Sequence, residues 1–236
     1  MINRTTIEIC LGNIQDVKKL NGLGIDRIEL NSALELGGLT PSLNTLIKAK
    51  EDTDIKIICM VRTRGGDFCY TEDEYDVMFK DAKLMLENNA DGIVFGFLNK
   101  DKTINVEKTK KMIDLIHSYG NKDAVFHKAF DEMDGDIFED TKALLDLGID
   151  RILTSGRAIY PDIVEGCEII GELHDKYGDK LQLLPGGGVR IENIQDVIKT
   201  AHTGQVHMTS KKTYDGNYIG LDIDQLTKLF EQIRLM

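Results

Sequence analysis

Short apolar segments rich in isoleucine and valine alternate with longer segments of helical periodicity along the whole chain. The expected strands cover residues 5–11, 26–31, 56–62, 92–97, 124–130, 151–155, 181–185 and 205–209. The clearest expected helices cover residues 71–89, 106–118, 137–147 and 222–235, and the first of these starts with the capping-box spacing of Thr71 and Glu74. Because strands that alternate with helices pair in parallel through right-handed crossovers, this order predicts an α/β fold.

The number of units indicates which α/β fold to expect. Eight strand–helix units in 236 residues fit a single (β/α)8 TIM barrel, which typically needs about 250 residues. An open doubly wound sheet is the rival. The segment GIDRIEL at 24–30 returns as GIDRILT at 148–154, about half the chain later, which favours the barrel although such turns are common. No linker rich in proline, glycine or serine divides the chain, so we expect one domain over 1–236.

The charge of the chain limits its partners. A formal net charge of −11 disfavours binding to nucleic acid or to an anionic membrane surface. The first ten residues lack the apolar core of a signal peptide, and no apolar run approaches the length of a membrane span. We therefore expect a cytoplasmic protein with reduced cysteines, and the absence of CxxC spacing argues against structural zinc.

Polar side chains at the ends of the first two strands are the first site candidates, because TIM barrels place their active sites there. Strand alternation puts Glu8 and Cys10 on one face, and puts Arg27, Glu29 and Asn31 on the interior face of the next strand. A buried Arg27–Glu29 ion pair would be purely structural. A functional Glu29 is the alternative.

Arginine and glycine after later strands suggest an anion site. Arg62 and Arg64 precede two glycines, a combination suited to carboxylate or phosphate. The other candidates for this anion site are Ser155, Gly186, Gly187 and Gly188, with Lys211 and Lys212 after the eighth strand. Tight turns alone would also explain the glycines.

Two histidines fall in expected strands. His127, Ala129 and Asp131 would share a face, so His127 and Asp131 are candidates for acid–base chemistry, and His127 also for metal binding. A core histidine with a satisfied hydrogen bond is the simpler interpretation. His207, inside the eighth strand, is either a core residue or a ligand.

Several segments together resemble the signature segments of the CutC family: RIEL at 27–30, GGLTPS at 37–42, RTRGGDFCY at 62–70, FHKAFD at 126–131, LTSG at 153–156 and PGGGV at 185–189. The resemblance spans about residues 7–210. It implies a TIM barrel, a cytoplasmic homo-oligomer (dimer or tetramer) and a role in copper homeostasis, with Cu(I) held by cysteine thiolates. Cys10 falls on one proposed ligand. Asn31 stands where the family usually has the partner cysteine, Thr63 replaces a proline, and Lys128 replaces an arginine.

Two hypotheses of function follow. The first is copper handling, with Cu(I) bound through Cys10 and no turnover. The second is an enzyme or binding protein for a small anionic metabolite, held by Arg62, Arg64 and the 186–188 loop while Glu29 and His127 transfer protons. We expect the copper role from the resemblance, whereas residue chemistry favours the anion.

Overall fold

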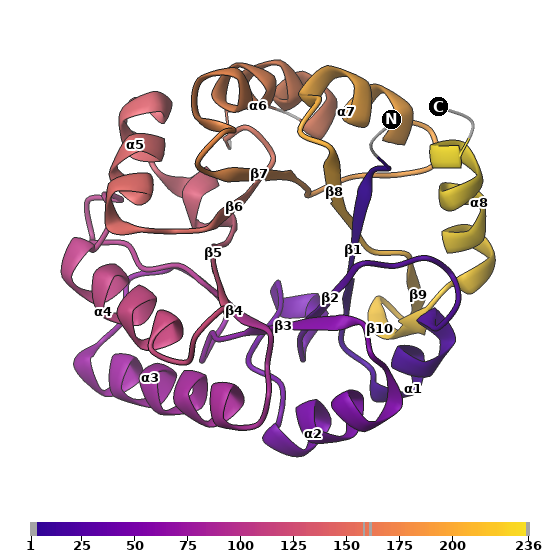
Figure 1. Cartoon of the computed structure of the whole chain (residues 1–236), viewed down its shortest axis with the longest axis horizontal. Coiled ribbons are helices and arrows are strands. Elements are labelled where there is room, and N and C mark those ends of the chain that lie inside the picture. Colours follow the sequence, from indigo (N-terminus) through magenta and orange to yellow (C-terminus); the bar gives the residue numbers. More distant parts are fainter. Residues whose placement is uncertain (1–3, 158, 161, 235–236) are drawn as a thin grey trace.

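In the computed structural model, which describes residues 4–157, 159–160 and 162–234, eight parallel strands form a ring inside a layer of helices (Figure 1). The strands of the ring are β1 (Thr6–Leu11), β2 (Arg27–Leu30), β3 (Lys56–Met60), β4 (Gly92–Phe95), β5 (Asp123–Phe126), β6 (Arg151–Thr154), β7 (Gln182–Pro185) and β8 (Gln205–Met208). The helices are α1 (Ile14–Val17), α2 (Leu43–Asp52), α3 (Glu72–Glu87), α4 (Val106–His117), α5 (Ile137–Leu147), α6 (Ile163–Tyr177), α7 (Ile194–Ala201) and α8 (Ile223–Arg234).

The order of the strands confirms the barrel. Hydrogen-bonded ladders run without a break in the order β7-β6-β5-β4-β3-β2-β1-β8, and all the paired strands are parallel. β7 and β8 lie side by side where the ring closes (Figure 1). The fold is therefore a (β/α)8 TIM barrel, and the open doubly wound sheet is excluded.

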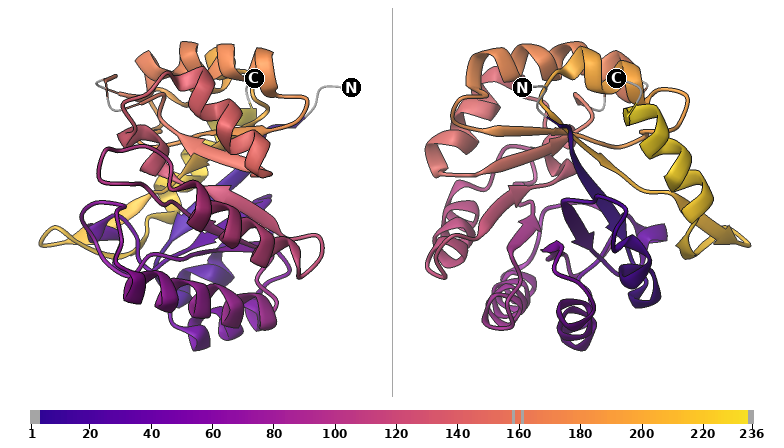
Figure 2. Two further views of the ribbon diagram at one scale, coloured as in Figure 1. Left: turned by 90° about the vertical axis from the view of Figure 1, so that its left-hand side faces the viewer. Right: turned by 45° about the vertical axis from the view of Figure 1, so that its right-hand side comes forward.

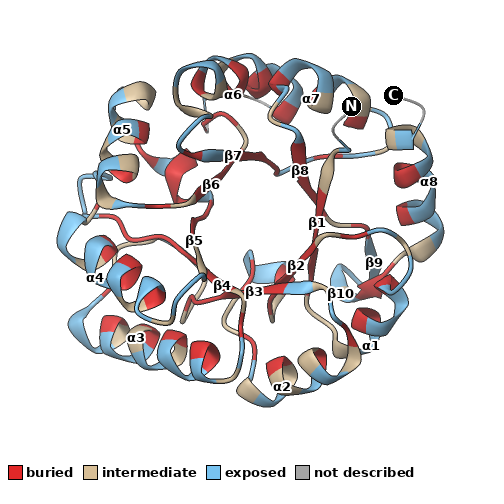
Figure 3. Cartoon of the chain, viewed as in Figure 1, coloured by how far each residue is buried: buried red, intermediate tan, exposed pale blue. Residues whose placement is uncertain are grey.

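Side chains alternate between two buried environments along each strand. Ile7, Ile9 and Leu11 of β1 face the helices and join the main apolar core, as do the inward faces of the amphipathic helices (Figure 3). None of the helices in the described residues is long and apolar enough to span a membrane. On the strand faces that point inward, a small apolar cluster of Ile58, Met60, Val94 and Val125 fills the β3–β5 side.

The opposite side of the barrel interior is ionic. The Glu8 carboxylate on β1 accepts hydrogen bonds from Arg27 Nε at 2.7 Å and from His207 Nδ1 at 2.8 Å, and Arg151 Nη1 lies 4.0 Å away. Arg27 also donates to Gln205 Oε1 at 2.7 Å. Burial opposes ionisation of Glu8, but His207, Arg27 and Arg151 together hold the pKa of its carboxyl well below the usual range.

Some element boundaries differ from the sequence prediction. The capping box of Thr71 and Glu74 is confirmed at the start of α3, and α5 has the predicted bounds. Residue 235, at the predicted end of the last helix, lies outside the described residues. The fifth strand was predicted to run to 130, which is wrong: it ends at Phe126, and Lys128–Glu132 form a 3-10 turn capped by His127.

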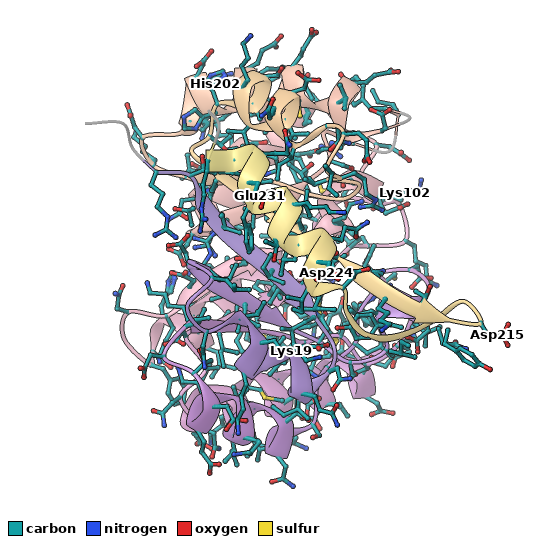
Figure 4. The ribbon with its side chains drawn as sticks, turned by 90° about the vertical axis from the view of Figure 1, so that its right-hand side faces the viewer. Lys19, Lys102, His202, Asp215, Asp224 and Glu231 are labelled. Carbon is teal, nitrogen blue, oxygen red and sulfur yellow. The ribbon has the colours of Figure 1, made fainter. Side chains whose placement is uncertain are left out.

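A hairpin of β9 (Lys211–Tyr214) and β10 (Asn217–Leu221) follows the eighth strand and was not predicted. It projects from the barrel, with Asp215 at its tip (Figures 2 and 4). Asp215 and Gly216 both have positive φ, as a two-residue hairpin turn requires. The buried Asp16 carboxylate anchors its base by accepting from Leu221 N at 2.8 Å and Tyr218 Oη at 3.1 Å.

Replacing Glu8 tests how much the fold depends on the ionic side of the barrel. Glu8→Gln keeps the shape of the side chain but leaves the buried Arg27 guanidinium without its carboxylate, so we expect a loss of about 3 kcal/mol in the free energy of unfolding. Urea unfolding measures this. The control Glu35→Gln, at an exposed glutamate, should change the midpoint little, and an equally stable Glu8→Gln protein would contradict the account.

Candidate functional site

A cavity of about 270 Å³ opens at the carboxyl ends of the strands. Its floor and walls combine sulfur, acidic, basic and apolar side chains. The polar and sulfur-bearing residues of its lining are Cys10, Glu29, Met60, Arg62, His127, Lys128, Arg190, His207, Met208, Thr209 and Lys211. The cavity therefore gathers residues from strands and loops across the whole chain, at the end of the barrel where TIM-barrel enzymes act.

Three potential metal ligands meet in this cavity. Cys10 on β1, Glu29 on β2 and His207 on β8 each offer one ligand atom, and the three atoms lie within 4.8 Å of one another. Neighbouring strands bring them together, because β1 pairs with β2 on one side and with β8 on the other, with Cys10 beside Glu29 in the ladder. We call these three residues the Cys–Glu–His cluster.

Glu8 fixes the orientation of His207. Because the carboxylate of Glu8 only accepts, His207 Nδ1 carries the proton in their 2.8 Å hydrogen bond, and the other ring nitrogen, Nε2, remains for a ligand or a proton. A carboxylate behind a histidine is the common arrangement at metal sites. Burial acts to lower the pKa of His207, but the charges of Glu29 and Glu8 raise it above the usual value.

Burial also shifts the acids of the cluster. It raises the pKa of Glu29, opposed in part by the charge of His207. It raises the pKa of the Cys10 thiol well above its usual value, and the nearby Glu29 adds to this effect. The thiol therefore keeps its proton at neutral pH.

Asn31 lies beside the cluster, at the end of β2. Its Nδ2 donates to Glu29 Oε1 at 2.9 Å and lies 3.4 Å from Cys10 Sγ. Position 31 is thus spatially adjacent to Cys10, and its asparagine orients the Glu29 carboxylate. The alternative of a buried Arg27–Glu29 ion pair is wrong, because Arg27 pairs with Glu8 instead.

The two arginines predicted to bind an anion have different environments. Arg62 lines the cavity, stacks on Phe68 with Cζ 4.6 Å from the ring centre, and donates to Gly66 O at 2.8 Å. Arg64 is not among the residues lining the cavity. Its guanidinium binds Glu74 Oε1 at 2.6 Å and Asp67 Oδ1 at 3.1 Å, so it holds the loop to the start of α3.

His127 and Asp131 do not share a strand face, because β5 ends before them. His127 lines the cavity, and its Nδ1 accepts from Ala129 N at 3.0 Å, so the proton is on Nε2. Gly96 makes room for the ring, since a Cβ there would lie 2.4 Å from His127 Cε1. The Asp131 carboxylate accepts from Thr154 Oγ1 and from Ser155 N at 3.0 Å, which ties the 3-10 turn after β5 to the end of β6.

Only part of the glycine loop predicted to bind an anion, residues 186–188, reaches the cavity. Gly187 and Gly188 line the cavity, whereas Gly186 packs between Leu153 and His207. Ser155 donates its hydroxyl to Asp131 at 2.8 Å and lies in an adjoining hollow that shares Arg62, Lys128 and Gly187 with the cavity. Of the lysine pair after β8, Lys211 lines the cavity.

The remaining cysteines lie away from the cluster. Cys59 belongs to the core between strands and helices, and Cys69 lies in the loop after β3, on another hollow that meets the cavity at Arg62 and Phe68. Met60, Phe68 and Lys128 also line the cavity, although none of the three was predicted to belong to the site. Strand alternation alone would have placed Met60 on the interior face of β3, next to Arg62.

The fold and the site together define a TIM-barrel protein with a sulfur, carboxylate and imidazole cluster at the floor of its mouth. A sequence model of the CutC family matches residues 5–212, so the chain belongs to the CutC family. A CutC family protein of Treponema denticola is 41% identical over 206 residues, 87% of this chain and 81% of the relative.

Two further relatives agree. A Drosophila melanogaster protein named copper homeostasis protein cutC homolog is 34% identical over 215 residues, 90% of this chain and 80% of the relative. The crystal structure of a CutC protein from Streptococcus agalactiae has a TM-score of 0.80 at 29% identity, and the match covers 86% of this chain and 97% of that one.

The protonation state of His127 is directly measurable. Burial, together with the charge of Arg62, lowers the pKa of His127 to about 3, so the ring should stay neutral with its proton on Nε2 from pH 5 to pH 8. His202 is the internal control, because its hydrogen bond to Asp175 raises its pKa above the usual imidazole value, so its ring should titrate. Nitrogen-15 chemical shifts of the histidine rings report both, and a His127 that titrates above pH 5 would contradict the geometry.

Proposed function

We propose that this chain acts in copper homeostasis and that its copper ion binds at the Cys–Glu–His cluster. One observation carries the proposal: the ligand atoms of Cys10, Glu29 and His207 lie within 4.8 Å of one another in a cavity that opens at the barrel mouth. The copper role is proposed because a relative from Drosophila melanogaster is named as a copper homeostasis protein. The cluster supplies a set of donors close enough to share one ion.

The chemistry of the donors fits copper. Cu(I) favours sulfur and also accepts imidazole, which Cys10 and His207 provide, while the Glu29 carboxylate balances charge and suits Cu(II). Two thiolates are not available here, because Asn31 occupies the second position and an amide does not replace a thiolate toward Cu(I). We therefore propose a site with one sulfur ligand.

The surroundings of the cluster assist binding. Glu8 presents the Nε2 lone pair of His207, and Asn31 holds one oxygen of Glu29. A copper ion displaces the thiol proton of Cys10, and the ionised Glu29 offsets the charge of the ion. Storage or transfer of copper requires no turnover. A cytoplasmic location suits this role, since all four cysteines are free thiols.

Anaerobic titration with Cu(I) against a competing chelator tests the site. The reduced protein should bind one equivalent, and Cys10→Ser should abolish that binding because it removes the only sulfur ligand of the cluster. Cys69→Ser is the matched control, since Cys69 lies outside the cavity, and it should bind as the parent does. Equal loss in both variants, or none in either, would contradict the proposal.

Restoring a cysteine at position 31 should strengthen the site. The amide of Asn31 lies 3.4 Å from Cys10 Sγ, so Asn31→Cys places a second sulfur next to the first. We expect the affinity for Cu(I) to rise by about tenfold or more, because Cu(I) prefers two thiolates to one. The same chelator competition measures it, with Asn31→Ser as the control that removes the amide without adding sulfur. An unchanged affinity would place the ion elsewhere.

A further inference from the structure

The wall of the cavity beside the Cys–Glu–His cluster is cationic. Four basic side chains line the cavity, Arg62, Lys128, Arg190 and Lys211, and Glu29 is the only acidic residue among the described lining. The chain as a whole carries a formal charge of −11, so this gathering of positive charge is local and opposite to the average surface. Positive charge repels a metal cation and attracts an anion. We call these four residues the cationic wall.

Buried donors in the same lining point to an oxygen-rich ligand. Arg62 Nε and His127 Nε2 are buried and have no hydrogen-bond partner among the described residues. Both side chains line the cavity, with exposed fractions of 6% and 3%. A buried donor without an acceptor is costly, so a ligand with acceptor oxygens would satisfy both. His127 is neutral and Nε2-protonated, which makes it a donor rather than a base.

The glycine loop shapes the opposite edge of the wall. Gly187 has φ of +96°, which favours glycine, and the Lys128 ammonium packs directly against it, since a Cβ there would lie 2.6 Å from Lys128 Nζ. Lys128 Nζ lies 3.6 Å from Asp131 Oδ2, but that carboxylate already accepts from Thr154 and Ser155. The Lys128 side chain is 46% exposed and lines the cavity, so its ammonium group is accessible to a ligand there.

We propose that the cationic wall, together with the neutral donor His127, binds a small organic oxyanion, a carboxylate or a phosphate monoester. Arg62, Lys128 and Lys211 are the residues of the wall that hold it. The volume of about 270 Å³ accommodates a small organic molecule of this kind. Arg64 and Ser155 take no part, since both are engaged outside the cavity. This inference does not depend on copper, because its residues are distinct from the three ligands of the cluster.

Calorimetric titration of the reduced, copper-free protein at low ionic strength tests the wall. Inorganic phosphate and malonate are the two probes. We expect saturable binding of one equivalent of at least one probe, and a fall in affinity of about tenfold or more in the Lys128→Met/Lys211→Met double variant. Binding of phosphate alone would identify a phosphate ligand, binding of malonate alone a carboxylate, and binding of both the shared oxyanion chemistry.

The control variant is Lys83→Met/Lys110→Met, which removes the same charge from exposed lysines on α3 and α4. It should bind the probes as the parent does. Equal weakening in both double variants would show a general charge effect and overturn the proposal, as would a lack of saturable binding by either probe. The probes are titrated in the absence of copper, so failure of the copper site leaves this test intact.

Discussion

The buried carboxylate of Glu8 is the interaction on which both the barrel and its site depend. It sits on β1, binds Arg27 from β2 and His207 from β8, and lies close to Arg151 of β6 across the interior. Removing any one of these charges would leave another uncompensated in a low-dielectric core. The same contact that balances the interior also sets the tautomer of His207, so the ionic side of the barrel is the support of the Cys–Glu–His cluster above it.

The barrel mouth is divided between two kinds of chemistry. The cluster comes from β1, β2 and β8, where soft and hard donors converge within 4.8 Å. The cationic wall comes from the loops after β3, β5 and β7 and from the β9–β10 hairpin, whose Lys211 reaches the cavity. A protein that only held a metal ion would have little use for four basic side chains around it. The two functions expected from the sequence overlap in this cavity: Cys10 of the copper hypothesis and Glu29, Arg62 and His127 of the anion hypothesis all line it, whereas Arg64 does not.

Much of the fold was predictable, because the alternation of apolar strands with amphipathic helices is local information. Strand alternation also placed Glu29 and Asn31 toward the interior, and Cys10 on the same face as Glu8. It failed at β5, where the 3-10 turn after Phe126 ended the alternation and separated His127 from Asp131. Strand alternation could not show that Arg27 pairs with Glu8 rather than with Glu29, because that choice depends on the neighbouring strand. It also could not show that Arg64 binds Glu74 and stays out of the cavity while Arg62 lines it. The Asp215-Gly216 turn was a local signal for the hairpin that went unused.

X-ray absorption at the copper K edge of the Cu(I)-loaded, reduced protein tests the central claim most directly, because it counts the sulfur and the nitrogen or oxygen ligands of the ion. The cluster predicts one sulfur ligand together with nitrogen or oxygen from His207 and Glu29. A spectrum with two or more sulfur ligands, or with none, would contradict a copper site at Cys10, Glu29 and His207.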